Sequence, residues 1–164
     1  MAEITLILGG ARSGKTAYAL SLTQAPRAYV ATAEAHDGEM ADRIAAHKAE
    51  RGDDWDLIEA PTDLTGAIGA ANGRTLLIDC LTLWLSNLMA AERDIAAETD
   101  ALIAALAEAS GPVIFVSNEI GMGLVPMEAL SRRFRDEQGR LNQRIAAAAN
   151  RVEFVAAGLP LRLK

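Results

Sequence analysis

The chain has 164 residues, 51% of them hydrophobic and 23% charged, and this length is typical of one domain with a buried core. We therefore expect a single domain over residues 1–164. The formal net charge of −6 argues against nucleic acid or an anionic membrane surface as the main partner. No apolar stretch is long enough for stable membrane insertion, and Cys80, as the single cysteine, cannot form an internal disulfide. These features favour a cytoplasmic protein.

The first motif in chain order is G-x-x-x-x-G-K-T at residues 9–16. In this pattern, glycines let successive backbone N–H groups converge on a β-phosphate, Lys15 reaches the β- and γ-phosphate oxygens, and the Thr16 hydroxyl ligates Mg²⁺. The motif needs a strand before it and a helix after it. Residues 4–8 are a β-rich apolar run and residues 15–22 have helical spacing, so both are predicted. The predicted phosphate-binding residues are Gly9, Gly10, Ala11, Arg12, Ser13, Gly14, Lys15 and Thr16.

The rest of the chain alternates between short apolar runs and longer helical patterns. Strands are predicted at residues 27–32, 55–59, 75–79, 113–116, 152–156 and 161–163, the last two around a turn at residues 158–160. Helices are predicted at residues 40–51, 61–71, 81–109 and 127–151, with breaks near the charged residues 92–98 and near Gly139. This alternation predicts an α/β fold: one P-loop NTPase-like domain with a mostly parallel sheet and helices on both faces.

Two further candidate binding residues lie at the ends of predicted strands. Asp79 closes a continuous apolar run, and P-loop proteins usually place an acid there to help hold Mg²⁺. We predict a metal site formed by Asp79 and Thr16. The alternative is that Asp79 caps the helix that follows it. Thr32 ends another strand, at the edge where open α/β sheets bind ligands.

His47, one of two histidines, lies on the predicted helix 40–51. Arg43, Lys48 and Arg51 are within four positions of it. Their positive field would orient phosphates beside a neutral imidazole, which is a competent nucleophile at pH 7. From this pattern alone, such a histidine is more often packed beside Ile44 or exposed to solvent than catalytic.

With these residues in view, the chain resembles the bifunctional adenosylcobinamide kinase/adenosylcobinamide-phosphate guanylyltransferase family of cobalamin biosynthesis. The resemblance covers nearly the whole length. Its motifs, in order, are GGARSGKT from Gly9, YVATAEA from Tyr29, EMADRIAAHKAER from Glu39, LLIDCLTLWLSNL from Leu76, VSNEIGMGLVP from Val116 and FRDEQGRLNQRIAAAAN from Phe134.

The resemblance implies an enzyme that first phosphorylates the aminopropanol hydroxyl of adenosylcobinamide with ATP or GTP, in the presence of Mg²⁺. It then transfers GMP from GTP to adenosylcobinamide phosphate, giving adenosyl-GDP-cobinamide and pyrophosphate. His47 occupies the RI-x-x-H-K position of the family and is implied to become covalently guanylylated, while Lys15 stabilises phosphate charge. A homotrimer is implied as well. Further nucleotide contacts are implied for Thr32, Ala33, Glu34, Lys48, Ala49, Glu50, Arg51, Glu59 and Asp79.

Several alternatives stay open. Glu59, Asp79 and Glu119 are candidates for the kinase general base. Residues 118–123 and 132–136 are candidates for contact with the corrinoid or a second subunit, although 132–136 is equally typical of a solvated charged helix. The protein could instead be a P-loop kinase with an inert His47, or a GTP-responsive regulatory protein. The last is disfavoured because the chain has no N-K-x-D motif and no recognisable switch glutamine.

Overall fold

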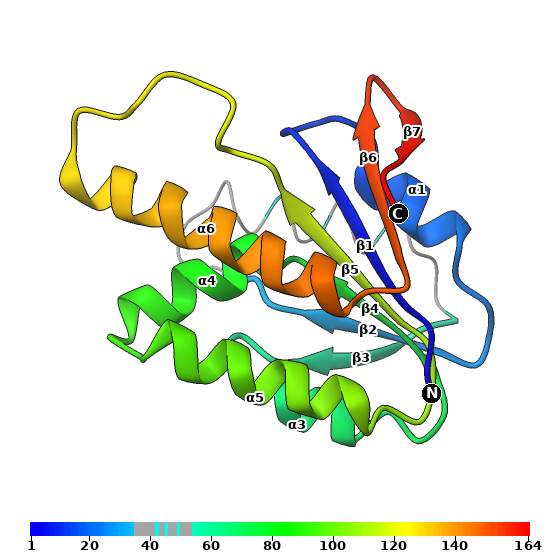
Figure 1. The fold of residues 1–164 in the computed structure, drawn as a ribbon. Coiled ribbons are helices and arrows are strands. Elements are labelled where there is room, and N and C mark those ends of the chain that lie inside the picture. Colours follow the sequence, from blue (N-terminus) through cyan, green and yellow to red (C-terminus); the bar gives the residue numbers. More distant parts are fainter. Residues whose placement is uncertain (35–41, 43–44, 46–48, 50–53) are drawn as a thin grey trace.

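The computed structural model describes residues 1–34, 42, 45, 49 and 54–164. Its centre is a seven-stranded sheet in the order β3-β2-β4-β5-β1-β6-β7 (Figure 1). β6 and β7 pair antiparallel, and the other neighbouring strands pair parallel. The strands are β1 (Ile4–Gly9), β2 (Arg27–Ala31), β3 (Asp56–Glu59), β4 (Thr75–Asp79), β5 (Val113–Asn118), β6 (Arg151–Ala156) and β7 (Leu159–Arg162). The helices are α1 (Lys15–Ser21), α3 (Leu64–Gly69), α4 (Leu81–Ala90), α5 (Ile95–Ala107) and α6 (Ala129–Ala148).

The central strands are those with continuous apolar sequences. All of β1 is buried, β4 is buried except at its two end residues, and β5 is buried except at its last residue, Asn118. Such runs suit strands that are covered on both faces, because side chains alternate between the two faces of a sheet. The strands predicted at residues 4–8, 75–79 and 113–116 are confirmed.

Helices cover both faces of the sheet, but unequally (Figure 1). The larger apolar cluster joins the strands to α3, α4, α5 and α6, and includes Trp84 and Leu141. The smaller cluster joins Ile7 and Leu77 to Ala19 of α1 on the opposite face. Among the described residues, α1 is the helix on that face. The predicted α/β fold with a mostly parallel sheet and helices on both faces is confirmed.

The helix boundaries agree with the sequence in some places and not in others. The predicted break near residues 92–98 is confirmed: α5 begins after Asp94, whose Oδ1 accepts a hydrogen bond of 3.1 Å from the Ala97 amide. The predicted break near Gly139 is wrong, because α6 runs through this residue. α3 begins later than predicted because Asp63 is its N-cap, and Asp63 Oδ1 accepts from the Gly66 amide at 2.8 Å.

The predicted turn at residues 158–160 is also misplaced. Ala157 and Gly158 form the turn, with φ of 52° and 77°, and Pro160 lies in β7. Two consecutive residues with positive φ connect antiparallel strands tightly, which leaves the following residues free to pair. Of the predicted helix 40–51, the structure describes Asp42, Ala45 and Ala49, which are helical and exposed. No helix in the described ranges is both long and apolar enough to cross a membrane.

Candidate nucleotide-binding site

The phosphate-binding motif has the predicted context of strand, loop and helix. β1 ends at Gly9, and α1 begins at Lys15. Gly14, the N-cap residue of α1, has φ of 91°, a conformation that side chains strain, and a Cβ there would lie 3.1 Å from Gly158 Cα. The Gly158 amide also donates to Ser13 O at 2.8 Å. The turn between β6 and β7 therefore supports the outer side of the loop.

Lys15 lies against its own loop. Its Nζ donates to Gly10 O at 2.8 Å, and most of the side chain is buried. Burial lowers the pKa of the Lys15 ammonium, and this effect exceeds the opposing influence of Cys80 and Asp79. The cation is thus placed at the first turn of the loop, beside the backbone N–H groups that the motif supplies for phosphate.

Asp79 and Thr16 face each other across the end of the sheet. Thr16 Oγ1 donates to Asp79 Oδ2 at 3.4 Å, and the Tyr29 hydroxyl donates to the same oxygen at 2.9 Å. The N-cap residue of α4 is Cys80, and α4 has no side-chain cap, so the alternative of Asp79 as a helix cap is not supported. A hydroxyl and a carboxylate are the oxygen ligands that Mg²⁺ prefers, usually together with phosphate oxygens. The pair therefore fits Mg²⁺, although no cluster of three acidic, cysteine or histidine ligands occurs in the described part of the chain.

The other predicted contacts lie along the same sheet edge. In register, Ala31 of β2 pairs with Asp79 of β4 on one side and with Glu59 of β3 on the other. Glu34 and Glu59 are exposed and Ala33 is partly exposed. Thr32 is different: it is fully buried, and its hydroxyl bonds to the backbone of Cys80. Its side chain is engaged within the protein.

His47, Lys48, Glu50 and Arg51 lie outside the described residues. Ala49 is described and is exposed on its helix. Their predicted roles stay predictions.

A buried polar network that the sequence analysis missed fixes the end of β5. Ser117 Oγ donates to Asn142 Oδ1 at 2.7 Å, and Gln138 Nε2 donates to both of these oxygens at 3.0 Å. Asn142 Nδ2 donates to Asn118 O at 3.1 Å, and the Glu119 amide donates to Gly9 O at 3.0 Å. The spacing of Gln138 and Asn142 by four residues, on the helix face that also carries Leu141 and Ile145, was the available signal.

The segment between β5 and α6 is held by two arginines. Arg135 donates to the carbonyl oxygens of Gly121 and Leu124, at 2.7 and 3.1 Å, and Arg132 donates to those of Pro126 and Met127. These bonds tie the start of α6 to the loop, whereas a contact of residues 132–136 with the corrinoid or a second subunit stays a prediction.

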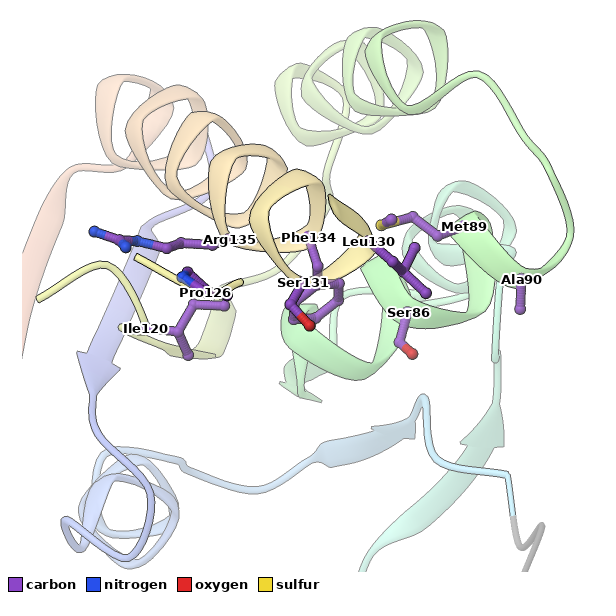
Figure 2. Close-up of a pocket in the computed structure, with 9 residues that line it drawn as sticks. All are labelled: Ser86, Met89, Ala90, Ile120, Pro126, Leu130, Ser131, Phe134 and Arg135. Carbon is purple, nitrogen blue, oxygen red and sulfur yellow. The ribbon is translucent and has the colours of Figure 1, made fainter. Parts of the chain in front are cut away.

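This segment, residues 119–128, is called the ordered loop below. It borders a groove of about 620 Å³ that is lined mainly by apolar side chains of α4, α6 and the loop (Figure 2). Figure 2 shows Ile120 and Pro126 of the loop on one side and Met89 of α4 on the other, with Phe134 between them. Large apolar side chains of the loop and the start of α6 are also exposed: Met122, Leu124, Val125, Met127 and Leu130.

Comparisons with solved structures extend the description of the fold. An ATPase of the type III secretion system of pathogenic bacteria superposes with a TM-score of 0.60 at 10% identity, over 98% of this chain and 56% of that one. The chain thus spans little more than half of that ATPase. A KaiC-like protein from Pyrococcus horikoshii superposes with a TM-score of 0.53 at 16% identity, over 93% of this chain and 70% of that one. Both show the P-loop NTPase fold.

Comparisons of sequence show the family. The bifunctional adenosylcobalamin biosynthesis protein CobP of Pseudomonas aeruginosa is 48% identical over 97% of this chain and 96% of its own length. The corresponding protein CobU of Salmonella typhimurium is 40% identical over 97% of this chain and 98% of its own. The model of the cobinamide kinase / cobinamide phosphate guanyltransferase family matches residues 5–163. The chain therefore belongs to the cobinamide kinase / cobinamide phosphate guanyltransferase family.

Proposed function

We propose that this protein phosphorylates adenosylcobinamide with ATP or GTP and then transfers GMP from GTP to adenosylcobinamide phosphate, through a histidine–GMP intermediate on His47. Its family supports both activities. One observation carries the proposal for this chain: beside the glycine loop, Thr16 Oγ1 of α1 lies 3.4 Å from Asp79 Oδ2 at the end of β4. A buried Ser13 hydroxyl in the same loop has no hydrogen-bond partner among the described residues, which also favours a polar ligand there.

In GMP transfer, an imidazole nitrogen of His47 attacks the α-phosphorus of GTP. The bond from this phosphorus to the bridging oxygen breaks, and pyrophosphate leaves with the electron pair. An oxygen of adenosylcobinamide phosphate then attacks the same phosphorus, and the P–N bond breaks to return the imidazole. Backbone amides of residues 9–16 and the Lys15 ammonium hold the leaving pyrophosphate and stabilise its charge.

In the kinase step, the substrate hydroxyl attacks the γ-phosphorus in line and gives its proton to a carboxylate, for which Glu59, Asp79 and Glu119 are the candidates. The bond from the γ-phosphorus to the bridging oxygen breaks, and the nucleoside diphosphate leaves with the electron pair. The same loop and Lys15 now stabilise charge on the group that is transferred. We assign Thr16 and Asp79 as the residues that hold Mg²⁺, which supplies further neutralisation of phosphate charge when bound. The remaining nucleotide contacts proposed are Thr32, Ala33, Glu34, Lys48, Ala49, Glu50, Arg51 and Glu59.

Covalent labelling separates this proposal from its alternatives. The protein is incubated with α-labelled GTP and Mg²⁺ and then denatured, and we expect a label that is retained and is labile to acid. His47→Ala should lose the label and keep most kinase activity, while His36→Ala, a change to the other histidine, should keep both. Label in His47→Ala would refute the role of His47. No label in any variant, with kinase activity, would favour a plain kinase, and stoichiometric GTP binding without turnover would favour a regulatory protein.

We also propose a cytoplasmic homotrimer of single-domain chains. The exposed apolar side chains gathered between residues 122 and 130 support a subunit contact, because exposed apolar groups that lie together usually mark an interaction surface. Light scattering after gel filtration tests the assembly. Leu124→Asp, a change at a side chain that is 96% exposed, should shift the trimer toward monomer without unfolding the chain. A monomeric parent protein would overturn this part of the proposal.

A further inference from the structure

We propose that Tyr29 is a positioning residue for Asp79: its phenol holds the carboxylate toward Thr16 and so sets the affinity of the site for the metal–nucleotide complex. This inference rests on the metal assignment in the proposed function. The observation behind it is that Asp79 Oδ2 accepts from the Tyr29 hydroxyl at 2.9 Å and from Thr16 Oγ1 at 3.4 Å. Both donors converge on one oxygen, and Tyr29 comes from a different strand and a different motif than the phosphate loop.

The strand register explains why a tyrosine can do this. β2 and β4 are neighbours, and Ala31 pairs with Asp79, while Tyr29 pairs with Leu77. Residues two apart share a sheet face, so the Tyr29 ring starts beneath Asp79 on the side that faces α1. The ring packs in the apolar cluster with Ile7 and Leu77. Two residues along a strand span roughly 7 Å, and a phenol is long enough to carry its hydroxyl over this distance.

The Tyr29 ring is itself held in place. It is 5% exposed and makes an edge contact with Trp55, with 6.1 Å between ring centroids and 86° between planes. The Arg27 guanidinium lies 4.4 Å from the centre of the Trp55 ring, and Arg27 Nη2 bonds to Asp54 Oδ2 at 2.7 Å. A ring with few alternative orientations gives its hydroxyl a fixed direction. The Asp79 carboxylate is therefore pre-organised before a ligand arrives, which is how supporting residues usually act on metal ligands.

The proposed role of Tyr29 differs from that of His47 in the reaction steps that it affects. His47 serves GMP transfer only, whereas the Tyr29–Asp79 contact serves a cradle used in both steps. Tyr29→Phe should thus slow both activities by a similar factor, at limiting Mg²⁺, and excess Mg²⁺ should restore much of the rate.

The deciding measurement is the affinity for Mn²⁺ in the presence of GDP, with free and bound Mn²⁺ distinguished by electron paramagnetic resonance. This measurement needs neither corrinoid nor turnover. We expect Tyr29→Phe to weaken Mn²⁺ binding about tenfold, the size typical of one hydrogen bond to a charged group. In an Asp79→Asn background, the same change should alter binding less than about twofold, because the hydroxyl acts through the carboxylate. Tyr18→Phe removes the same atom from the other tyrosine, whose hydroxyl bonds Arg151, and should leave Mn²⁺ binding unchanged.

A second measurement is made on the unsubstituted chain, so it does not depend on the folding of Tyr29→Phe. The chain has two tyrosines, and 3-fluorotyrosine labelling should give two ¹⁹F resonances, assigned with Tyr18→Phe. Adding Mg²⁺ to the GDP complex should shift the Tyr29 resonance and not that of Tyr18. Equal Mn²⁺ binding by Tyr29→Phe and the parent, additive effects in the double variant, or an unmoved Tyr29 resonance would each overturn the inference. Failure of GMP labelling with normal Mn²⁺ results would overturn the proposed function alone.

Discussion

Thr32 Oγ1 lies 2.8 Å from both the amide nitrogen and the carbonyl oxygen of Cys80. Thr32 follows the last residue of β2, and Cys80 follows the last residue of β4. The side chain therefore continues the pairing of the two strands beyond the point where their backbones separate. Asn87 of α4 adds to this clamp by donating to Thr32 O at 2.8 Å. The clamp fixes the backbone that carries Asp79.

Removing the Thr32 hydroxyl should destabilise the fold more than removing its methyl group. Thr32→Val keeps the shape but leaves the buried amide of Cys80 without an acceptor, while Cys80 O keeps its bond from the Trp84 amide at 3.2 Å. The orphaned amide should lower the free energy of unfolding by about 2 kcal/mol. Thr32→Ser keeps the hydroxyl and should cost about 1 kcal/mol for the lost methyl group. Urea denaturation of the two variants measures the difference. A Thr32→Ser protein that is the less stable of the two would contradict the clamp.

Cys80 should be unreactive in the native protein. Burial, and then the charge of Asp79, raise the pKa of the thiol to about 11, so little thiolate exists at pH 8. Iodoacetamide reacts with the thiolate and not with the thiol. Cys80 is also only 8% exposed, so the reagent has little access to its sulfur. We expect alkylation at pH 8 to be at least about 100-fold slower in the native than in the urea-unfolded chain. Because the chain has one cysteine, mass spectrometry reads the extent directly. Similar rates in the two states would show that the thiol is open to solvent.

Much of the fold could be predicted because local sequence agrees with the final structure. Apolar runs predicted the buried strands, and the glycine motif predicted the loop between β1 and α1. The site was predicted less completely. Tyr29 and Thr32 reach Asp79 and Cys80 because β2 lies beside β4 in the sheet, although β3 separates them in sequence. Strand order is a tertiary property, so periodicity along the chain does not reveal these contacts.

The misplaced elements have local physical causes. Residues 158–160 resemble a turn because they contain glycine and proline, yet the positive φ of Ala157 moves the turn one position earlier. Proline is then tolerated because β7 is an edge strand. Asp63 was a usable N-cap signal that the proline at position 61 obscured.

Acid should weaken the attachment of α1 to β6. Arg151 donates to Glu153 Oε1 at 2.7 Å from Nε and to the Tyr18 hydroxyl of α1 at 3.1 Å from Nη2. Burial alone would raise the pKa of the Glu153 carboxyl, but Tyr18 and Arg151 outweigh it, so this pKa lies below its ordinary 4.5. A carboxylate with a lowered folded-state pKa stabilises the protein fully above pH 4.5, and this contribution is lost as the pH falls through the folded-state pKa.

Glu153→Gln should therefore lower the free energy of unfolding by about 2 kcal/mol at pH 7, and the gap to the parent protein should narrow below pH 4.5. Urea denaturation at pH 7, 4 and 3 tests this. Glu137→Gln, which changes a surface pair with Arg140, should cost less than about 0.5 kcal/mol at pH 7. A gap for Glu153→Gln that stays constant over this pH range would contradict the sign of the pKa shift.

Gly139 gives a direct test of the longest helix. α6 runs from Ala129 to Ala148 without a break, and a Cβ at Gly139 would meet no atom within 4 Å. Glycine in a helix interior costs about 0.5–1 kcal/mol relative to alanine, because its unfolded chain has more conformational freedom. Gly139→Ala should raise the free energy of unfolding by that amount and leave nucleotide binding unchanged. Gly14→Ala is the matched opposite: with φ of 91° and Gly158 Cα 3.1 Å from the new Cβ, it should destabilise the fold and weaken nucleotide binding. Equal losses of stability from both substitutions would mean that α6 does bend at Gly139, as its sequence alone indicates.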